Sequence, residues 1–245
     1  MAGKHWRRVP VPILAPVAGV VVMAAVAGLA GCHSGAGHAS SGGATRTPSA
    51  AAQTGPFTAV RLRGALLAKV NGVAAASAQD GGYATLAAVK AAGLPARGDS
   101  VTPKSCAQMT LTGLDSAALA GAPAAAVTFR VGPNGVSEIL ATAPSAEASS
   151  ALAGKTATGC GHYQATIGGT KVRYTATEAA VTGIGAQARV LHVQTAGKPA
   201  DDTWSMVYRG KGFVGAVTVT GPNASAAAVR ELGQQAYAYA AYTLS

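Results

Sequence analysis

The sequence has few charged and few aromatic side chains. Asp, Glu, Lys and Arg make up 11% of the residues and Phe, Trp and Tyr 5%, while Ala, Gly, Ser and Thr fill much of the chain. The basic residues are spread singly rather than clustered beside aromatic residues, which argues against a nucleic-acid-binding protein. The Ala- and Gly-rich composition is typical of a GC-rich genome of the actinobacterial type and carries no information about function.

Motifs of the common catalytic classes are also missing. The chain has no G-x-S-x-G sequence, no H-E-x-x-H pair and no C-x-x-C pair. The run 153–156 ends like a phosphate-binding loop, but Ser149 stands where such a loop needs its first glycine. We therefore predict a protein that is not an enzyme and that needs no cofactor and no metal ion.

Cysteine occurs three times, at Cys32, Cys106 and Cys160. An odd count in an exported protein requires an explanation for the unpaired residue. Outside the cytoplasm Cys106 and Cys160 are expected to form a disulfide. Closing that loop of about 55 residues would stabilise the fold by on the order of 4 kcal/mol in the chain-entropy model. Cys32 is then left for a different role.

The first 31 residues have the layout of a secretory signal peptide. Three basic residues precede Val9, and the following run to Ala30 is apolar and carries no charge. The run is long enough for a retained membrane anchor. However, three prolines weaken its first turns, and no basic stop-transfer cluster follows it. The pair Arg7-Arg8 leaves twin-arginine export open beside the favoured general secretion route.

The end of this run, Leu29-Ala30-Gly31-Cys32, resembles the bacterial lipobox. At such a site an exported lipoprotein is lipidated on its cysteine and cleaved just before it. A diacylglyceryl thioether supplies two fatty acyl chains such as palmitate, the number needed for stable anchoring. We therefore predict that residues 1–31 are removed and that Cys32 anchors the protein in the outer face of the cell membrane.

Residues 32–56 are predicted to be a flexible tether that follows the anchor. The 24 residues from His33 to Pro56 are rich in Gly, Ser, Ala and Thr and too polar to bury a core. A chain of this kind spans about 25–30 Å. Without the three basic residues of the signal peptide, the 19 basic residues fall to 16, against 9 acidic ones. This moderately basic balance suits an anionic membrane or cell-wall polymer.

Residues 57–245 are predicted to form a single extracytoplasmic α+β domain. Hydrophobic spacing predicts helices over 60–70, 83–92, 145–152 and 222–243, and a helical turn near Asp115. Alternating side chains predict strands over 127–131, 136–143, 162–167, 171–177, 189–195, 204–208 and 213–220. Because short loops favour antiparallel neighbours, we predict an antiparallel sheet of about six to seven strands. N-terminal helices and a long C-terminal helix are expected to pack on it.

Several features of this domain are similar to the extracellular sensor domain of mycobacterial PknH-type serine/threonine kinases and of related lipoproteins. They are Leu66-Leu67, Pro103 with Cys106, the apolar strand before Gly132, Cys160 after an Ala-rich helix, Val207-Tyr208-Arg209-Gly210 and the long terminal helix. The resemblance implies a central cleft for an unknown ligand. Domains of this family usually carry two disulfides, whereas this chain has one candidate pair. No functional residues transfer, because the family has no defined motif.

Candidate ligand-binding residues come from the polar faces of two predicted strands. Arg130 alternates with apolar residues in one strand, and Lys171 and Arg173 do so in another. A sheet surface or cleft wall that carries these cations would suit an anionic ligand. The alternative is an ordinary solvated sheet face.

These observations favour a non-catalytic, lipid-anchored domain that binds an envelope ligand or a protein partner in a sensor-like manner. A second hypothesis is a cell-envelope hydrolase or transferase whose site is assembled from distant residues. Its candidate residues are His162, His192, Asp201 and Glu178. A third hypothesis is a passive envelope assembly factor.

Overall fold

The computed structural model describes residues 56–93, 100–114, 116–153, 159–196 and 202–245, which all belong to one compact unit, Thr47–Ser245. The expected signal peptide, Cys32 and nearly all of the tether lie outside the described residues, as do Asp115 and Asp201. Within the part of the chain that is described, no helix combines the length and the hydropathy needed to cross a membrane.

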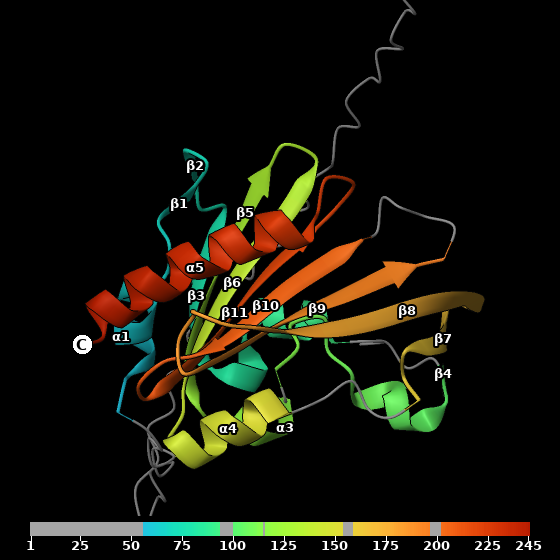
Figure 1. Ribbon diagram of the computed structural model, residues 1–245, viewed down its shortest axis with the longest axis horizontal. Coiled ribbons are helices and arrows are strands. Elements are labelled where there is room, and N and C mark those ends of the chain that lie inside the picture. The colour runs from blue at the N-terminus through green and yellow to red at the C-terminus, as the bar shows by residue number, and fades with distance from the viewer. Residues whose placement is uncertain (1–55, 94–99, 115, 154–158, 197–201) are drawn as a thin grey trace, which may run out of the picture. The chain divides into compact units, whose positions relative to one another are not determined.

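A nine-stranded antiparallel sheet forms the centre of the domain (Figure 1). The strand order across the sheet is β3-β5-β6-β11-β10-β9-β8-β7-β4. The strands are β3 (Ser77–Gly82), β4 (Val101–Thr102), β5 (Pro123–Val131), β6 (Asn134–Thr142), β7 (His162–Ile167), β8 (Thr170–Val181), β9 (Gln187–Thr195), β10 (Thr203–Arg209) and β11 (Phe213–Thr220). The predicted α+β class with an antiparallel sheet is confirmed.

The hairpin of β5 and β6 shows how the sequence produces this sheet. Val127 and Phe129 point into one core, and Arg130 lies on the opposite, alternate face. The two strands are joined by Gly132 and Pro133, with Gly132 at a φ of +59°. A glycine tolerates this left-handed conformation, and the resulting two-residue turn matches the twist of a hairpin. The hairpin that the alternating strands predict is confirmed, but its turn is Gly132-Pro133 and not the expected Pro133-Asn134-Gly135.

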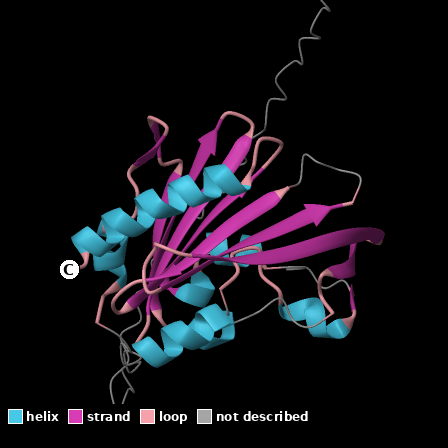
Figure 2. Ribbon diagram, in the orientation of Figure 1, coloured by secondary structure: helices cyan, strands magenta, loops and turns pink. Residues whose placement is uncertain are grey.

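Helices cover both faces of the sheet (Figure 2). On one face α1 (Ala59–Gly64) and α5 (Ala226–Thr243) pack over the first hydrophobic cluster. On the other face α2 (Ala87–Ala92), α3 (Ser116–Leu119) and α4 (Ser145–Ala153) pack with the 3-10 helix η1 (Tyr83–Thr85) over a second cluster. A third, smaller cluster surrounds the disulfide beside the 3-10 helix η2 (Lys104–Gln108).

The long C-terminal helix is confirmed, with one correction to its buried stripe. The hydroxyl of Ser225 accepts a hydrogen bond of 3.2 Å from the backbone N–H of Ala228 and so caps the first turn. Helical spacing in the sequence predicts one apolar stripe of Val229, Leu232, Ala236 and Tyr239, and the first three are buried. Tyr239 is exposed instead, because Ala240 occupies the next position on the buried face.

The predicted helix over 60–70 is wrong in its second half. The helix α1 ends at Gly64, and the chain then forms a small hairpin of β1 (Lys69–Val70) and β2 (Val73–Ala74). Asn71 and Gly72 form its turn with φ values of +49° and +79°. This Asn-Gly pair favours a tight hairpin turn, which overrides the helical spacing of the preceding residues.

The sheet also has more strands than the predicted six to seven. The two additional strands, β3 and β4, are the two edges of the sheet. Among the described strands, β3 pairs with β5 alone and β4 with β7 alone. Edge strands have one unpaired side, so they tolerate polar and glycine-rich sequences such as Ser77–Gly82. Their sequences therefore lack the apolar alternation that identified the inner strands.

Candidate functional site

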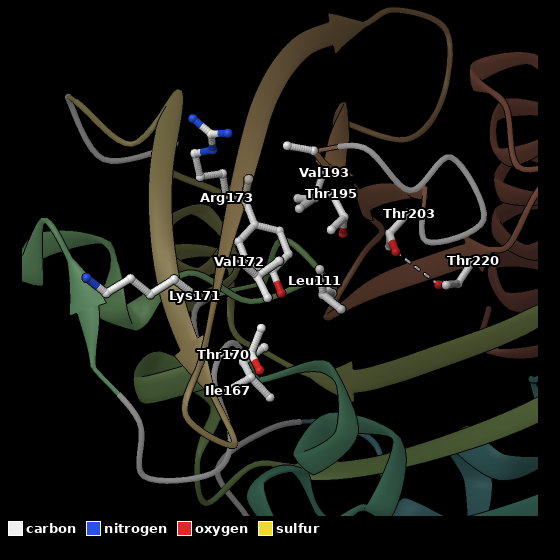
Figure 3. A pocket seen from close by; sticks show the side chains of 12 residues that line it. Leu111, Ile167, Thr170, Lys171, Val172, Arg173, Val193, Thr195, Thr203 and Thr220 are labelled. Carbon is white, nitrogen blue, oxygen red and sulfur yellow. Dashed lines mark hydrogen bonds between the residues drawn. The ribbon is translucent and has the colours of Figure 1, made fainter.

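A pocket of about 650 Å³ lies on the sheet face that carries the disulfide cluster (Figure 3). It is bordered by the ends of strands β7 to β11 and by the segment that follows η2. Its lining residues are Leu111, Ile167, Thr170, Lys171, Val172, Arg173, Tyr174, Val193, Thr195, Ala196, Thr203 and Thr220. The volume falls in the range of small-molecule sites.

Strand alternation places the apolar lining. Val172 and Tyr174 occupy even positions of β8 and therefore point to the same face of the sheet. Tyr174 is the register partner of Thr195, and Val193 lies one step further along the same face of β9. The aliphatic and aromatic lining of the pocket thus comes mainly from two neighbouring strands.

Threonine hydroxyls supply the polar groups of the pocket. Thr203 and Thr220 are register partners on β10 and β11, and their hydroxyl oxygens lie 3.2 Å apart in a hydrogen bond (Figure 3). Thr203 is 3% exposed, and Thr195 is also buried. Each hydroxyl can both donate and accept a hydrogen bond, so this end of the pocket can bind a polar atom of a ligand without a formal charge.

Leu111 forms one wall of the pocket. Three hydrogen bonds hold the segment 111–113 against the rest of the domain. Its backbone N–H donates to the carbonyl of Ala92 over 2.7 Å, and its carbonyl accepts from the hydroxyl of Ser205. Two residues later, the carbonyl of Gly113 accepts from Nη2 of Arg189. This irregular segment is therefore held against strands β9 and β10.

Arg189 is itself held by an ion pair. Its Nη1 donates to Oε1 of Glu178 over 2.7 Å, and both side chains are largely buried. Burial lowers the pKa of Arg189, and the neighbouring Glu178 opposes that shift. The charged guanidinium of Arg189 on β9 thus connects β8 with the segment that carries Leu111.

The disulfide of Cys106 and Cys160 lies in the cluster beneath the pocket. The two Cα atoms are 5.6 Å apart, and the pairing is the one predicted from the cysteine count. The cluster also contains the rings of Tyr163 and Tyr174, which stack at 5.0 Å between centroids. Burial raises the pKa of Tyr163, so its hydroxyl stays neutral. The disulfide and the ring of Tyr163 therefore hold the ring of Tyr174 in place at the bottom of the pocket.

The three predicted cationic residues do not form one surface. Arg130 lies on β5, five strands away from Lys171 and Arg173 on β8, and by alternation it faces the opposite side of the sheet. Lys171 and Arg173 do border the pocket, but their charged ends point away from Thr203 in Figure 3. The interior of the pocket is therefore lined by uncharged groups.

The described acid and base candidates, His162, His192 and Glu178, do not line the pocket. Nε2 of His192 is 3.7 Å from Oδ2 of Asp202, and its ring stacks on Trp204 at 3.9 Å between centroids. Nδ1 of His162 is 3.5 Å from the hydroxyl of Thr175 on the exposed sheet face. Glu178 pairs with Arg189 as described above. Among the described residues, the contacts of the two histidines bring no nucleophile within 3 Å.

A metal site was not predicted from the sequence. Among the residues that the structure describes, no three His, Cys, Asp or Glu side chains gather where they could hold a metal ion.

Sequence reasoning missed the threonines and Leu111 as lining residues. Threonine is common throughout this chain, and alternation identifies the face of a strand but does not show which strands curve around a cavity. Leu111 follows no periodic pattern, because it belongs to an irregular segment. The one available signal was that Val193 and Thr195 share a face of their strand.

The fold is an α+β domain with a large antiparallel sheet, and a domain of known structure shares it. The solved structure of the extracellular domain of PknH from Mycobacterium tuberculosis is similar, with a TM-score of 0.53. The match has 13% sequence identity and covers 77% of this chain and 97% of that chain. At this identity the similarity establishes the fold alone, and it confirms the predicted resemblance to the PknH-type sensor domain.

A second solved structure matches more weakly. It is an uncharacterized Mycobacterium smegmatis protein, the Rv0999 ortholog, with a TM-score of 0.34 and 16% identity over 70% of this chain and 86% of that chain. This similarity is too low to support an argument. By sequence, no family model and no curated protein matches the chain.

Proposed function

We propose that the protein is an exported lipoprotein, anchored through Cys32, whose domain binds a small ligand without transforming it. The observation that carries this proposal is the 650 Å³ pocket lined by aliphatic side chains and threonine hydroxyls. A mostly apolar cavity with a few convergent polar groups is the usual form of a small-molecule site.

The lining points to an uncharged, largely apolar ligand. Val172, Val193 and Leu111 supply apolar contacts, and burial of apolar ligand surface drives such binding. The hydroxyls of Thr195, Thr203 and Thr220 favour a hydroxyl or carbonyl group at the other end. Lys171 and Arg173 also line the pocket, but their charged ends point away from the threonine pair in Figure 3, so an anionic ligand stays the alternative.

The same lining argues for binding rather than catalysis. The twelve described residues that border the pocket include no His, Cys, Asp or Glu. A nucleophile needs a base within hydrogen-bond reach, and neither His162 nor His192 reaches the pocket. A hydrolase or transferase site therefore has no support in this cavity.

Two observations support an extracytoplasmic location. A disulfide persists outside the cytoplasm and is rare within it, and Cys106 and Cys160 form one. The domain of similar fold is extracellular in PknH. The lipid anchor at Cys32 rests on the Leu-Ala-Gly-Cys sequence alone.

The test is to fill the pocket and follow the bound molecule. Val172→Trp on β8 puts an indole into the cavity, whereas Thr177→Trp puts the same group on the exposed, opposite face of that strand. Native mass spectrometry of protein purified from envelope extract should detect a bound small molecule in the wild type and in Thr177→Trp, but not in Val172→Trp.

Thermal unfolding provides the second measurement. Extract fractions that contain the ligand should stabilise the wild type, since a ligand at 100 times its Kd adds about 2.7 kcal/mol. Retention of the molecule by Val172→Trp would show that the pocket is not the site. A wild type that neither carries a molecule nor gains stability would leave the proposal without support.

A further inference from the structure

The two most exposed large hydrophobic side chains of the described residues are Tyr242, at 83%, and Val60, at 71%. Tyr239, one helical turn before Tyr242, is 42% exposed. Such side chains cost free energy in water, and a group of them on one surface marks a site of interaction.

A series of aromatic contacts runs from the residue pair before α1, across the sheet, to α5. Phe57, two residues before α1, meets Phe213 with ring centroids 6.4 Å apart. Phe213 meets Tyr208 at 6.5 Å, and Tyr208 meets Tyr237 of α5 at 5.7 Å. Figure 1 shows α1 and the last turns of α5 at the same end of the domain, near the marked C-terminus.

Both helices turn their exposed residues away from the sheet. In α1 the buried residue is Leu62, so Val60 lies on the outer side. In α5 Ala236 and Ala240 are buried, and Tyr239 and Tyr242 take the outer side. Together with Arg61 they form what we call the α1–α5 surface: Val60, Arg61, Tyr239 and Tyr242.

Two exposed cations, Arg61 and Lys211, lie near the α1–α5 surface. Arg61 is exposed, and its guanidinium lies 5.2 Å from the centre of the Phe57 ring. Lys211 is also exposed, in the turn whose Gly212 packs against Pro56. Residues 232–245 contain no acidic side chain. The combination of tyrosine, a small apolar residue and cations is the one that suits the interface of an anionic bilayer.

The chain also enters the domain at this end. Pro56 is the last residue before Phe57 and α1, and the sequence predicts a flexible tether of 24 residues between it and Cys32. Such a tether spans about 25–30 Å. An anchor at Cys32 therefore keeps the α1–α5 surface within reach of the lipid headgroups.

We propose that the α1–α5 surface rests on the anionic phospholipid bilayer to which the protein is anchored. Tyr239 and Tyr242 place their rings at headgroup level with the hydroxyls in water, Val60 enters the interface, and Arg61 contacts lipid phosphates. The inference rests on the lipid anchoring in the proposed function. The pocket lies on the other face of the sheet and stays open to ligand from the periplasmic or cell-wall side.

The experiment uses the lipidated chain in vesicles of phosphatidylcholine with phosphatidylglycerol. Its lipidated Cys32 and its Cys106–Cys160 disulfide leave an introduced cysteine as the single free thiol. Tyr242→Cys and Val60→Cys carry an environment-sensitive fluorophore to the α1–α5 surface. Glu147→Cys on α4 carries it to an exposed control position on the other face of the sheet.

On vesicles, the emission of the label at residues 60 and 242 should shift to the blue. A quencher located in the lipid headgroups should quench these two labels at least twofold more than the label at residue 147. The difference should disappear in vesicles of phosphatidylcholine alone. Equal quenching at all three positions overturns the proposal. A blue shift that also occurs without vesicles overturns it too and indicates that a second copy of the chain covers the surface.

A second arrangement separates docking from anchoring. The compact unit Thr47–Ser245 carries an N-terminal histidine tag and is tethered to vesicles that contain a nickel-chelating lipid, so that Cys32 is not needed. In this form Arg61→Glu should abolish the blue shift at residue 242, while the matched charge change Arg130→Glu should preserve it. If the full chain does not float with vesicles while the tagged unit still shows the blue shift, the lipid anchor is refuted and the docking proposal is not. If the label at residue 242 of the tagged unit shows no blue shift on vesicles, docking is refuted and the lipid anchor is not.

Discussion

The backbone N–H of Leu67 donates a 2.8 Å hydrogen bond to Oε2 of Glu138, whose side chain is buried in the core beneath α1. The other carboxyl oxygen and the hydroxyl of Tyr208 have no hydrogen-bond partner among the described residues. Burial raises the pKa of Glu138 to about 8, and the hydrogen bond from Leu67 opposes this only in part. Burial also raises the pKa of Tyr208, and the nearby Glu138 adds to that rise. Glu138 is therefore protonated at neutral pH.

This proton makes the stability of the domain depend on pH. The pKa of Glu138 is 4.5 in the unfolded chain and about 8 in the fold, so between these values the native state holds a proton that the unfolded state releases. The stabilisation from this group is complete below pH 4.5 and is lost as pH rises towards 8. The free energy of unfolding should fall by on the order of 4–5 kcal/mol across this window.

Glu138→Gln should remove most of this dependence, because the amide keeps the shape and an acceptor for Leu67 but does not ionise. Urea unfolding at pH 5 and pH 8 measures both proteins. The variant should be at least as stable as the wild type at pH 8. Parallel pH profiles for the two proteins would refute this account of Glu138.

The disulfide should contribute substantially to stability. Cys106 and Cys160 are 54 residues apart in sequence, and in the chain-entropy model a loop of that length is worth on the order of 4 kcal/mol. The Cys106→Ala/Cys160→Ala variant should therefore unfold at a clearly lower denaturant concentration than the oxidised protein. Thiol counting on the unfolded, unreduced mature protein should find no free thiol, and two free thiols would rule out the bond.

Arg189 should determine the rigidity of the pocket wall. Arg189→Met removes the hydrogen bond to the carbonyl of Gly113 and the ion pair with Glu178, at a cost of about 2 kcal/mol. Hydrogen exchange should accelerate in residues 111–114. The matched control is Arg63→Met, which breaks the exposed pair with Asp80 and should cost less than about 1 kcal/mol. Equal exchange in both variants would show that Arg189 does not hold the wall.

Cys32→Ala should abolish lipid anchoring. The substitution removes the thiol that carries two acyl chains, and a chain without them has no stable hold on the bilayer. Labelling with a radioactive fatty acid should be lost, and uncleaved precursor should accumulate. Ser34→Ala, two residues away, should leave both processes intact. A mature, membrane-bound Cys32→Ala product would refute the lipoprotein hypothesis.

The inner part of the fold could be predicted because its sequence carries local signals. Strands β7 and β11 have the predicted bounds, and the cap and apolar stripe of α5 indicated a long helix. The short helix α1 was overestimated, since the Asn71-Gly72 turn has a stronger local preference than the helical spacing before it. The edge strands were missed because pairing on one side alone leaves little trace in a sequence.

The sequence by itself determined the α+β class and the cysteine pairing, since these depend on short-range periodicity and on an odd cysteine count. The lipid anchor, which depends on a four-residue motif, stays a prediction. Only the tertiary structure decided which residues meet. It gathered Thr195, Thr203 and Thr220 from three strands into one pocket and left Arg130 outside that pocket, on β5, five strands away from Lys171 and Arg173. It also buried Glu138, because the curvature and order of a sheet arise from contacts between distant segments that no local pattern records.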